Sequence, residues 1–381
     1  MAEPVVQAYW DASSGEPLLP EAQQAWSTAA SAGWGDPLRL HRPGRLAAQA
    51  LDAARETVAQ AVGARPDEVV FTGSGVAAAH AAVTGLALGR RRTGDCVVTS
   101  TTDHSSVLAA ADAAGRRAAV GVDVEGHLDL DRWRDTVAAE GVAAACLQVA
   151  NHEVGTRQPV TEAAEACAAV GVPLVLDATS ALGRVDLRGL GGWSVLTGAA
   201  SAFGGPASVG LLVIRRGTRW RAPYPADDYQ GGRWPGAPDV PAVYAAAVAL
   251  DAWLRFGRAV GERQHALVHR LRTAIAARVP DLEVAGDPTN RVPHLLTFSA
   301  LYVDGETLTR ELDRAGFAVA SGSACSASSE HPSHVLAAMG LLTHGNVRIG
   351  LTRRSTSAEV DRFLDVLPPL VAEIRDRLGA P

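Results

Sequence analysis

Three side chains in this sequence have the types and the neighbours that chemistry requires: Cys325, Asp177 and His104. Cys325 lies in a run of glycine, serine and alanine, where a flexible and solvent-reachable loop is expected. A reachable thiol can be deprotonated and act as a nucleophile. A buried structural cysteine is the alternative, and the polar character of the segment disfavours it.

Asp177 and His104 each follow a stretch with the pattern of a β-strand. Asp177 ends the apolar run 172–176, and His104 follows the run 97–100. Parallel α/β sheets bind their ligands beyond the carboxyl ends of the strands, so Asp177 is expected at a ligand site. On the residues alone, Asp177 could instead cap a helix, and a lone histidine could be an ordinary surface or core residue.

The other three cysteines have the surroundings of core residues. Cys96 and Cys146 lie in apolar, strand-like runs, and Cys167 lies in an alanine-rich helical pattern. The four cysteines are widely spaced and include no CxxC pair, so they predict neither a disulfide framework nor a metal site. We expect Cys96, Cys146 and Cys167 to be buried.

The chain contains no lysine: all 35 residues of the combined lysine and arginine count are arginine. A guanidinium group stays protonated and is not a nucleophile, so arginine cannot replace a lysine amine in covalent chemistry. The 38 glycines and the heavy use of alanine and arginine suggest a biased coding composition, which could also explain the missing lysine. Such a bias would still be expected to spare one lysine that the chemistry needs.

Composition predicts an ordinary globular protein of one or two domains. The chain has 381 residues, 47% of them apolar, and a net charge of −6. No run of about 18 apolar residues and no signal-peptide pattern is present, so we predict a cytoplasmic protein without a membrane span. The negative charge argues against nucleic acid as a partner, and the small arginine cluster at 90–92 is better explained as a solvated turn.

Helical and strand patterns alternate along the chain, which is typical of a mainly parallel sheet with helices on both faces. Helices are expected at 44–62, 77–88 and 160–169, and strands at 68–71, 96–100, 143–149, 173–176 and 194–197, with an antiparallel return at 210–215. A long helix is expected at 242–279, broken near 257–261. A smaller α+β C-terminal unit follows, with strands at 295–298 and 318–321 and a helix at 305–315. The predicted division is a large domain at 16–250 and a small domain made of 1–15 and 251–381.

Several motifs together resemble one family. The loop at 321–326, Ser-Gly-Ser-Ala-Cys-Ser, and the segment Pro-Ser-His-Val-Leu at 332–336 resemble the active-site loop of cysteine desulfurases. These are class V aminotransferase-like enzymes that use pyridoxal phosphate (PLP). Further similar motifs occur in family order at 9–11, 66–72, 103–104, 151–156, 177–178 and 204–206. The resemblance implies the PLP-dependent transferase fold of type I for the predicted α/β sheet.

The resemblance also implies a role for each candidate residue. In the family, a loop cysteine attacks the sulfur of PLP-bound L-cysteine and becomes a persulfide, and Cys325 matches that cysteine. Asp177 matches the aspartate that pairs with the pyridinium nitrogen, and His104 matches the histidine that stacks on the ring. Asn151 matches the asparagine near the ring hydroxyl. Arg348 matches the arginine that clamps the substrate carboxylate, a task that suits its planar fork.

The family also implies partners. A homodimer is expected, with the segment 233–236 matching a loop that reaches toward the partner's cofactor phosphate. L-cysteine or a related small thiol is the implied substrate, and a small sulfur-acceptor protein is a further possible partner.

The chain departs from the family pattern around the cofactor. Counting back from the Gly-Pro pair at 205–206 places Ala202 where the family has its Schiff-base lysine. Ala199 and Ser201 replace a phosphate-binding serine and histidine. Val76 replaces a threonine and Ser180 a glutamine. PLP is therefore expected to bind noncovalently, if it binds.

Some phosphate binding is still expected from backbone N–H groups. The Gly-Ser-Gly turn at 73–75, which includes Gly75, delivers such groups at the start of a helix. Ser201 and His80 are candidates to compensate for the lost side chains.

Three explanations stay open for this combination. The chain could be a lysine-to-alanine variant, at Ala202, of an active PLP-dependent desulfurase. It could be a natural, divergent protein that still carries or transfers sulfur on Cys325. It could also be a non-catalytic dimeric scaffold or binding protein. The changes beyond Ala202 favour divergence, whereas the retained Cys325 loop and Arg348 disfavour a scaffold.

Overall fold

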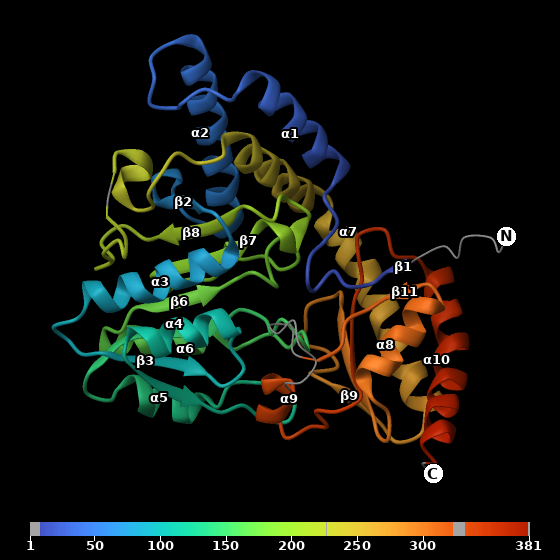
Figure 1. Cartoon of the computed structure of the whole chain (residues 1–381). Helices are drawn as coiled ribbons and strands as arrows, with labels where there is room; N and C mark the ends of the chain where they lie inside the picture. The colour runs from blue at the N-terminus through green and yellow to red at the C-terminus, as the bar shows by residue number, and fades with distance from the viewer. Residues whose placement is uncertain (1–7, 226, 323–331, 380–381) are drawn as a thin grey trace.

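The computed structural model describes residues 8–225, 227–322 and 332–379, which form a large and a small unit (Figure 1). The α-helices are α1 (Pro20–Ala32), α2 (Arg42–Val62), α3 (Gly75–Gly89), α4 (Ser105–Ala114), α5 (Leu130–Val137), α6 (Val160–Val170), α7 (Val240–Arg278), α8 (Gly305–Arg314), α9 (His334–Ala338) and α10 (Ser357–Leu378). The strands are β1 (Ala8–Tyr9), β2 (Val69–Thr72), β3 (Cys96–Ser100), β4 (Arg116–Val120), β5 (Val142–Gln148), β6 (Leu174–Asp177), β7 (Val195–Ala199), β8 (Gly210–Ile214), β9 (Leu282–Ala285), β10 (Leu295–Ala300), β11 (Phe317–Ala318) and β12 (Asn346–Gly350). Short 3₁₀ turns are η1 (Pro66–Glu68), η2 (Ala200–Phe203) and η3 (Tyr229–Gly232).

The large unit is built on a seven-stranded sheet of order β2-β8-β7-β6-β5-β3-β4. The strands β4, β3, β5, β6 and β7 run parallel to one another. β8 returns antiparallel between β7 and β2. The predicted α/β class, its mainly parallel sheet and its antiparallel return are therefore confirmed.

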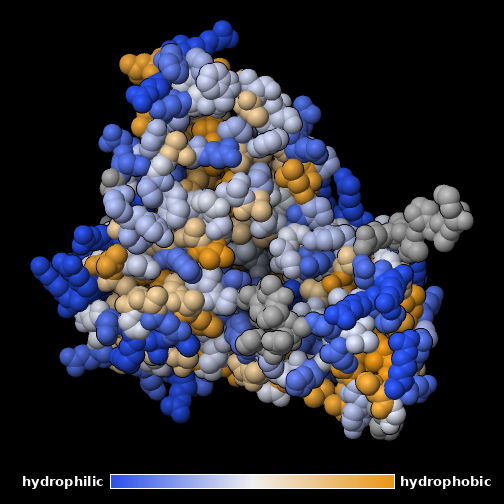
Figure 2. Space-filling view, in the orientation of Figure 1, coloured by the Kyte–Doolittle hydropathy of each residue, from blue (hydrophilic) through white to orange (hydrophobic). Residues whose placement is uncertain are grey.

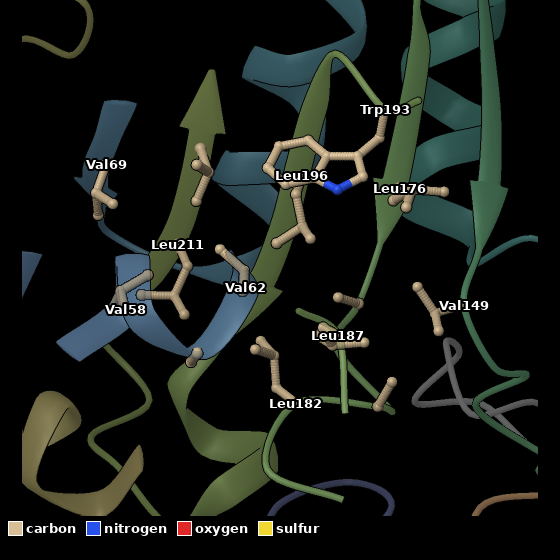
Figure 3. Close-up of a cluster of buried hydrophobic side chains, with 14 of the residues drawn as sticks. Val58, Val62, Val69, Val149, Leu176, Leu182, Leu187, Trp193, Leu196 and Leu211 are labelled. Carbon is tan, nitrogen blue, oxygen red and sulfur yellow. The ribbon is translucent and has the colours of Figure 1, made fainter. Parts of the chain in front are cut away.

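Both faces of this sheet are buried under helices, which explains the near-continuous apolar strands. Along β6, Leu174 and Leu176 face one hydrophobic cluster and Val175 faces the other, as the two-residue period of a strand requires. The first cluster lies against α2, α5, α6 and α7, and the second lies against α3 and α4. Figure 3 shows Leu176, Leu196 and Leu211 of three strands in the first cluster with Val58 and Val62 of α2.

The small unit has its own sheet and its own core. β10 pairs antiparallel with β12 and β9, and the N-terminal strand β1 pairs with β11. Trp10, Phe317 and Phe363 pack together with ring centroids 5.1–5.2 Å apart. The N-terminal segment thus belongs to the same core as the C-terminal third of the chain. The division at residue 250 stays a prediction, because α7 contributes side chains to both cores.

Two expectations about local structure were wrong. The helical pattern is not broken at 257–261, because α7 continues through it to Arg278. A Cβ atom on Gly257 would lie 2.6 Å from the Gly183 carbonyl oxygen, so this glycine serves close packing and does not end the helix. The strand expected at 318–321 ends at Ala318, and Ala320 forms only an isolated bridge with Arg348.

The surface carries scattered apolar side chains among mostly hydrophilic ones on the face in Figure 2. Four of the exposed large apolar residues come from α1 and the link to α2: Trp26, Trp34, Leu38 and Leu40. By length and composition α7 could cross a membrane, but 61% of its most apolar 18-residue stretch is buried inside the protein. The apolar character of α7 is therefore explained by its burial and does not indicate a membrane span.

The two glycines of α7 provide a matched test of this packing. We expect Gly257→Ala to lower the free energy of unfolding by about 1–2 kcal/mol, because its methyl group would meet the Gly183 carbonyl oxygen. Gly261→Ala meets nothing closer than 3.6 Å and should raise it by about 0.5–1 kcal/mol through helix propensity. Urea denaturation of both variants measures the difference. Equal effects of the two substitutions would show that the contact at Gly257 is unimportant.

Candidate functional site

A cavity of about 310 Å³ lies where the carboxyl ends of the parallel strands meet the small unit. The ends of β5, β6 and β7 reach it, as do the loop after β3, the start of α3 and the residues just before and at the start of β10. Parallel α/β sheets bind ligands at this edge. Its walls comprise Ala12, Ser13, Ser14, Ser74, Gly75, Val76, Ala79, His104, Ser106, Gln148, Ala150, His152, Asp177, Thr179, Ser180, Arg184, Ala199, Ser201, Ala202, Ala207, His294 and Leu295.

Most of the predicted site residues meet in this cavity. Six of the nine line its walls: His104, Asp177, Gly75, Val76, Ser201 and Ala202. Asn151 and Arg348 are buried beside the walls, and His80 also lies outside them. Cys325 lies outside the described residues, so its position relative to the cavity stays a prediction.

Asp177 ends β6 and presents its carboxylate at the cavity. Its Oδ1 atom accepts hydrogen bonds from the backbone N–H and the hydroxyl of Thr179, at 3.0 and 2.6 Å. Within the described residues Oδ2 makes no hydrogen bond. The side chain therefore stabilises the turn after β6 and still has an acceptor oxygen for a ligand. The alternative that Asp177 caps a helix was wrong, because no helix lies between β6 and β7.

His104 begins α4 and is held in a fixed orientation. Its Nδ1 accepts a hydrogen bond from the Ser106 backbone N–H at 3.2 Å and lies 2.8 Å from the Ser106 hydroxyl. When this ring is neutral, its proton is therefore on Nε2. The edge of this ring meets the His152 ring, with centroids 4.9 Å apart, and His152 stacks at 6.2 Å on His334. Three imidazoles from separate segments thus lie in a row.

Asp103, next to His104, links the ends of two neighbouring strands through its carboxyl group. One of its carboxyl oxygens accepts the Ser100 N–H and the other accepts the Gln148 N–H, both at 2.9 Å. Burial, reinforced by the negative charge of Asp177, raises the pKa of Asp103 to about 7, against the opposing effect of these hydrogen bonds and His104. The carboxyl group thus ties β3 to β5 at the point where both strands reach the cavity.

The start of α3 offers backbone N–H groups to an anion. Ser74 caps the helix by accepting the Ala77 N–H at 3.1 Å, and Gly75 and Val76 line the cavity. A Cβ atom on Gly75 would lie 2.6 Å from the Ala199 side chain, so only glycine fits between α3 and β7. This geometry suits a phosphate group without specialised side chains.

The wall around Ala202 contains an arginine that the sequence analysis missed. Arg184 donates from Nη1 to the Ala202 carbonyl at 2.5 Å and from Nη2 to Glu16 at 3.0 Å. Both charged side chains are almost fully buried, at 1% and 2% exposure, and the guanidinium lies 4.7 Å from the Trp253 ring centroid. Glu16 also accepts the Arg353 N–H. No local pattern marks Arg184, because its partners are distant in sequence.

Arg348 and Asn151 support the cavity from behind its walls. Arg348 donates from Nε to the hydroxyl of Ser13 at 2.7 Å, and its buried Nη1 has no partner in the described part of the chain. Asn151 donates to the Thr102 carbonyl and accepts two backbone N–H groups, from Glu153 and Val154. Asn151 therefore fixes the loop after β5. The roles that the resemblance implies for both residues stay predictions.

The three remaining cysteines, Cys96, Cys146 and Cys167, are buried, as expected. Burial raises the pKa of Cys167 to about 12 and raises the pKa of Cys146 well above its usual range. Burial also raises the pKa of Cys96. Few of these thiols are thiolates near neutral pH.

The buried Glu16–Arg184 pair predicts a large cost when one charge is removed. We expect Glu16→Gln to lower the free energy of unfolding by about 3–5 kcal/mol, because it leaves the Arg184 charge buried without its partner. The control is Glu262→Gln, since the Arg258–Glu262 pair is exposed and should contribute less than about 1 kcal/mol. Thermal or urea unfolding compares the two variants. Similar losses in both would contradict the structural role of Glu16.

Comparison with known proteins adds a consistent picture. The family model described as aminotransferase class-V matches residues 17–363. The chain is 36% identical over 380 residues to a cysteine desulfurase of Cereibacter sphaeroides, covering 97% of each protein. It is 33% identical to the cysteine desulfurase NifS of Azotobacter vinelandii, covering 90% of this chain and 87% of that protein. A solved NifS-like protein superposes with a TM-score of 0.89 at 23% identity, covering 97% of this chain and all of that one.

Proposed function

Since the chain belongs to the cysteine desulfurase family of class-V aminotransferases, we propose that it mobilises sulfur from L-cysteine or a related small thiol through a persulfide on Cys325. The observation that carries the proposal is the cavity at the sheet edge. This cavity brings together His104, Asp177 and the start of α3. The chain that forms it is similar to a cysteine desulfurase over nearly its whole length.

The cavity residues fit PLP in part. The oxygen of Asp177 that lacks a partner within the described residues would hold the pyridinium nitrogen, and the backbone at Gly75 and Val76 would hold the phosphate. His104 lines the cavity and would contact the ring. When bound, PLP supplies an electron sink for bonds to the amino-acid Cα. The fit fails at Ala202, because neither it nor any other residue of this lysine-free chain offers a side-chain amine.

The chain's own residues would then bind and orient the substrate. The buried Nη1 of Arg348, unpaired among the described residues, is suited to a substrate carboxylate if Ser13 moves aside. His104, fixed by Ser106, would hold a proton at Nε2 facing the ligand. The Cys325 thiolate would form a bond to the substrate sulfur as the sulfur–carbon bond breaks. The electron pair of the broken bond would stay with the substrate carbon, which takes up a proton and leaves as alanine, and Cys325 would keep the persulfide.

We also propose that the functional unit is a homodimer. Exposed Trp34 and Leu40, at 69% and 88%, are unusual for a surface that faces only water and support an interface at the α1–α2 end. The segment 233–236 is the second part of this proposal. Arg233 donates to the Asp67 carbonyl at 2.7 Å, which holds the segment against the large unit.

Selective labelling tests the sulfur chemistry. With limiting iodoacetamide, Cys325 should react at least about tenfold faster than Cys96, Cys146 or Cys167, whose burial suppresses the thiolate. A persulfide donor should modify the same residue, as mapped by mass spectrometry. The Cys325→Ser variant should lose the modification and the transfer of sulfur to a small acceptor protein. Equal or lower reactivity at Cys325 would favour the scaffold alternative.

The missing lysine gives a second prediction. PLP should be removed by dialysis, and borohydride should leave no PLP adduct on any side chain. Release of alanine from L-cysteine should be about 10²–10⁴-fold below that of a variant with a working lysine, because a general acid–base group is missing. The Ala202→Lys variant supplies that comparison, with Ala202→Met as the size control.

The outcome separates two of the three explanations. Strong activity restored by Ala202→Lys alone would indicate that a lysine had been replaced at this position. No gain would indicate older divergence, consistent with Ala199, Val76 and Ser180 in the phosphate and ring region. A PLP adduct on a side chain of the unsubstituted chain would contradict the prediction.

A further inference from the structure

His294 is a cavity residue to which the proposed function gives no role. It lies just before β10, lines the cavity and is only 2% exposed. Its backbone carbonyl accepts the Leu351 N–H at 2.9 Å, which fixes this position against the end of β12. The backbone at His294 is therefore held in place by the framework of the small unit.

The His294 ring has unused hydrogen-bonding capacity. Its Nδ1 is fully buried and has no partner in the described segments, and Nε2 forms no hydrogen bond with them either. Since Nε2 is not one of the fully enclosed atoms, it is the nitrogen through which the ring reaches the cavity. Buried imidazoles normally have their polar atoms satisfied, so an unpaired ring in a cavity wall indicates a ligand group opposite it.

The charges around His294 favour a neutral ring and an anionic ligand group. Burial, together with the positive charges of Arg184 and Arg291, lowers the pKa of His294 well below its usual value. In the neutral ring a proton on Nε2 gives the cavity a donor, while the lone pair on Nδ1 stays in the field of the two guanidinium groups. The same field attracts negative charge to this part of the cavity.

The terminal nitrogens of the neighbouring Arg184 are already occupied. Arg184 uses Nη1 for the Ala202 carbonyl and Nη2 for Glu16, and its Nε is enclosed. Ala202 contributes only a methyl group where a longer side chain could have offered an amine. His294 therefore presents Nε2 to the cavity beside Ala202 without a partner among the described residues.

We propose that His294 donates a hydrogen bond from Nε2 to an anionic group, carboxylate or thiolate, of a small amino-acid thiol bound beside Ala202. This inference rests on the proposed function and adds the residue that selects the substrate. The contact makes His294 a binding residue. Its loss should lower the affinity for the ligand and leave the fold intact.

Calorimetric titration of the full chain with L-cysteine under reducing conditions, with and without PLP, tests the contact. His294→Leu should weaken L-cysteine roughly 10- to 100-fold, the effect of losing a hydrogen bond to a charged group. His294→Gln, which keeps a donor at a similar reach, should recover most of the affinity. Gln264→Leu is the matched control, because Gln264 is also buried with an unpaired oxygen in the described chain but does not line the cavity.

Two analogues identify the ligand group. Cysteamine lacks the carboxylate and L-alanine lacks the thiol. The analogue without the contacted group should bind the unsubstituted chain and His294→Leu equally well. Thermal unfolding confirms that each variant is folded, and if His294→Leu does not fold, the comparison of His294→Gln with His294→Asn replaces it, with Asn expected to bind more weakly.

Equal affinity of the unsubstituted chain and His294→Leu would overturn the proposal, as would an equal loss in Gln264→Leu. Failure of the unsubstituted chain to bind L-cysteine in either form would overturn it as well. The proposed function is judged separately, by the persulfide on Cys325. A persulfide that forms normally in His294→Leu with unchanged L-cysteine affinity would remove His294 and leave the sulfur chemistry standing.

Discussion

The buried ion pair between Glu16 and Arg184 is the interaction on which the cavity depends. Through it the N-terminal segment, the loop after β6, the turn at Ala202 and the segment at Arg353 are held in one arrangement. Two charges withdrawn from water are costly, and this cost is offset only while every partner stays in place. The pair therefore makes the arrangement of these four segments all-or-none.

The polar groups around this pair favour a neutral His294 ring and a negative ligand group. His104 is fixed by Ser106, and His294 is kept neutral by burial and by two arginines. Asp177 supplies the one carboxylate that lines the cavity among the described residues. A ring with a positive nitrogen and a negative tail is complementary to such walls, with Asp177 at one end and the start of α3 at the other.

The sequence predicted what depends on local pattern. The parallel strands were identified because burial on both faces makes them continuously apolar, and Asp177 and His104 were placed because they follow such strands. Arg184 and His294 were missed because their importance comes from partners far along the chain, with a sequence separation of 168 between Arg184 and Glu16. Gly257 was misjudged for the same reason: local propensity marks a helix break, whereas the glycine accommodates the distant Gly183 carbonyl.

The unbroken α7 has a mechanical consequence. With 39 residues, it is a strut of about 58 Å whose first half is packed in one core and whose second half is packed in the other. A rigid strut transmits a rotation and does not absorb it. Any tilt of the small unit would therefore move Trp253 on this helix. The Arg184 guanidinium lies over the Trp253 ring and would move with it. A force applied at the C-terminal helices would thus displace a side chain in the cavity wall.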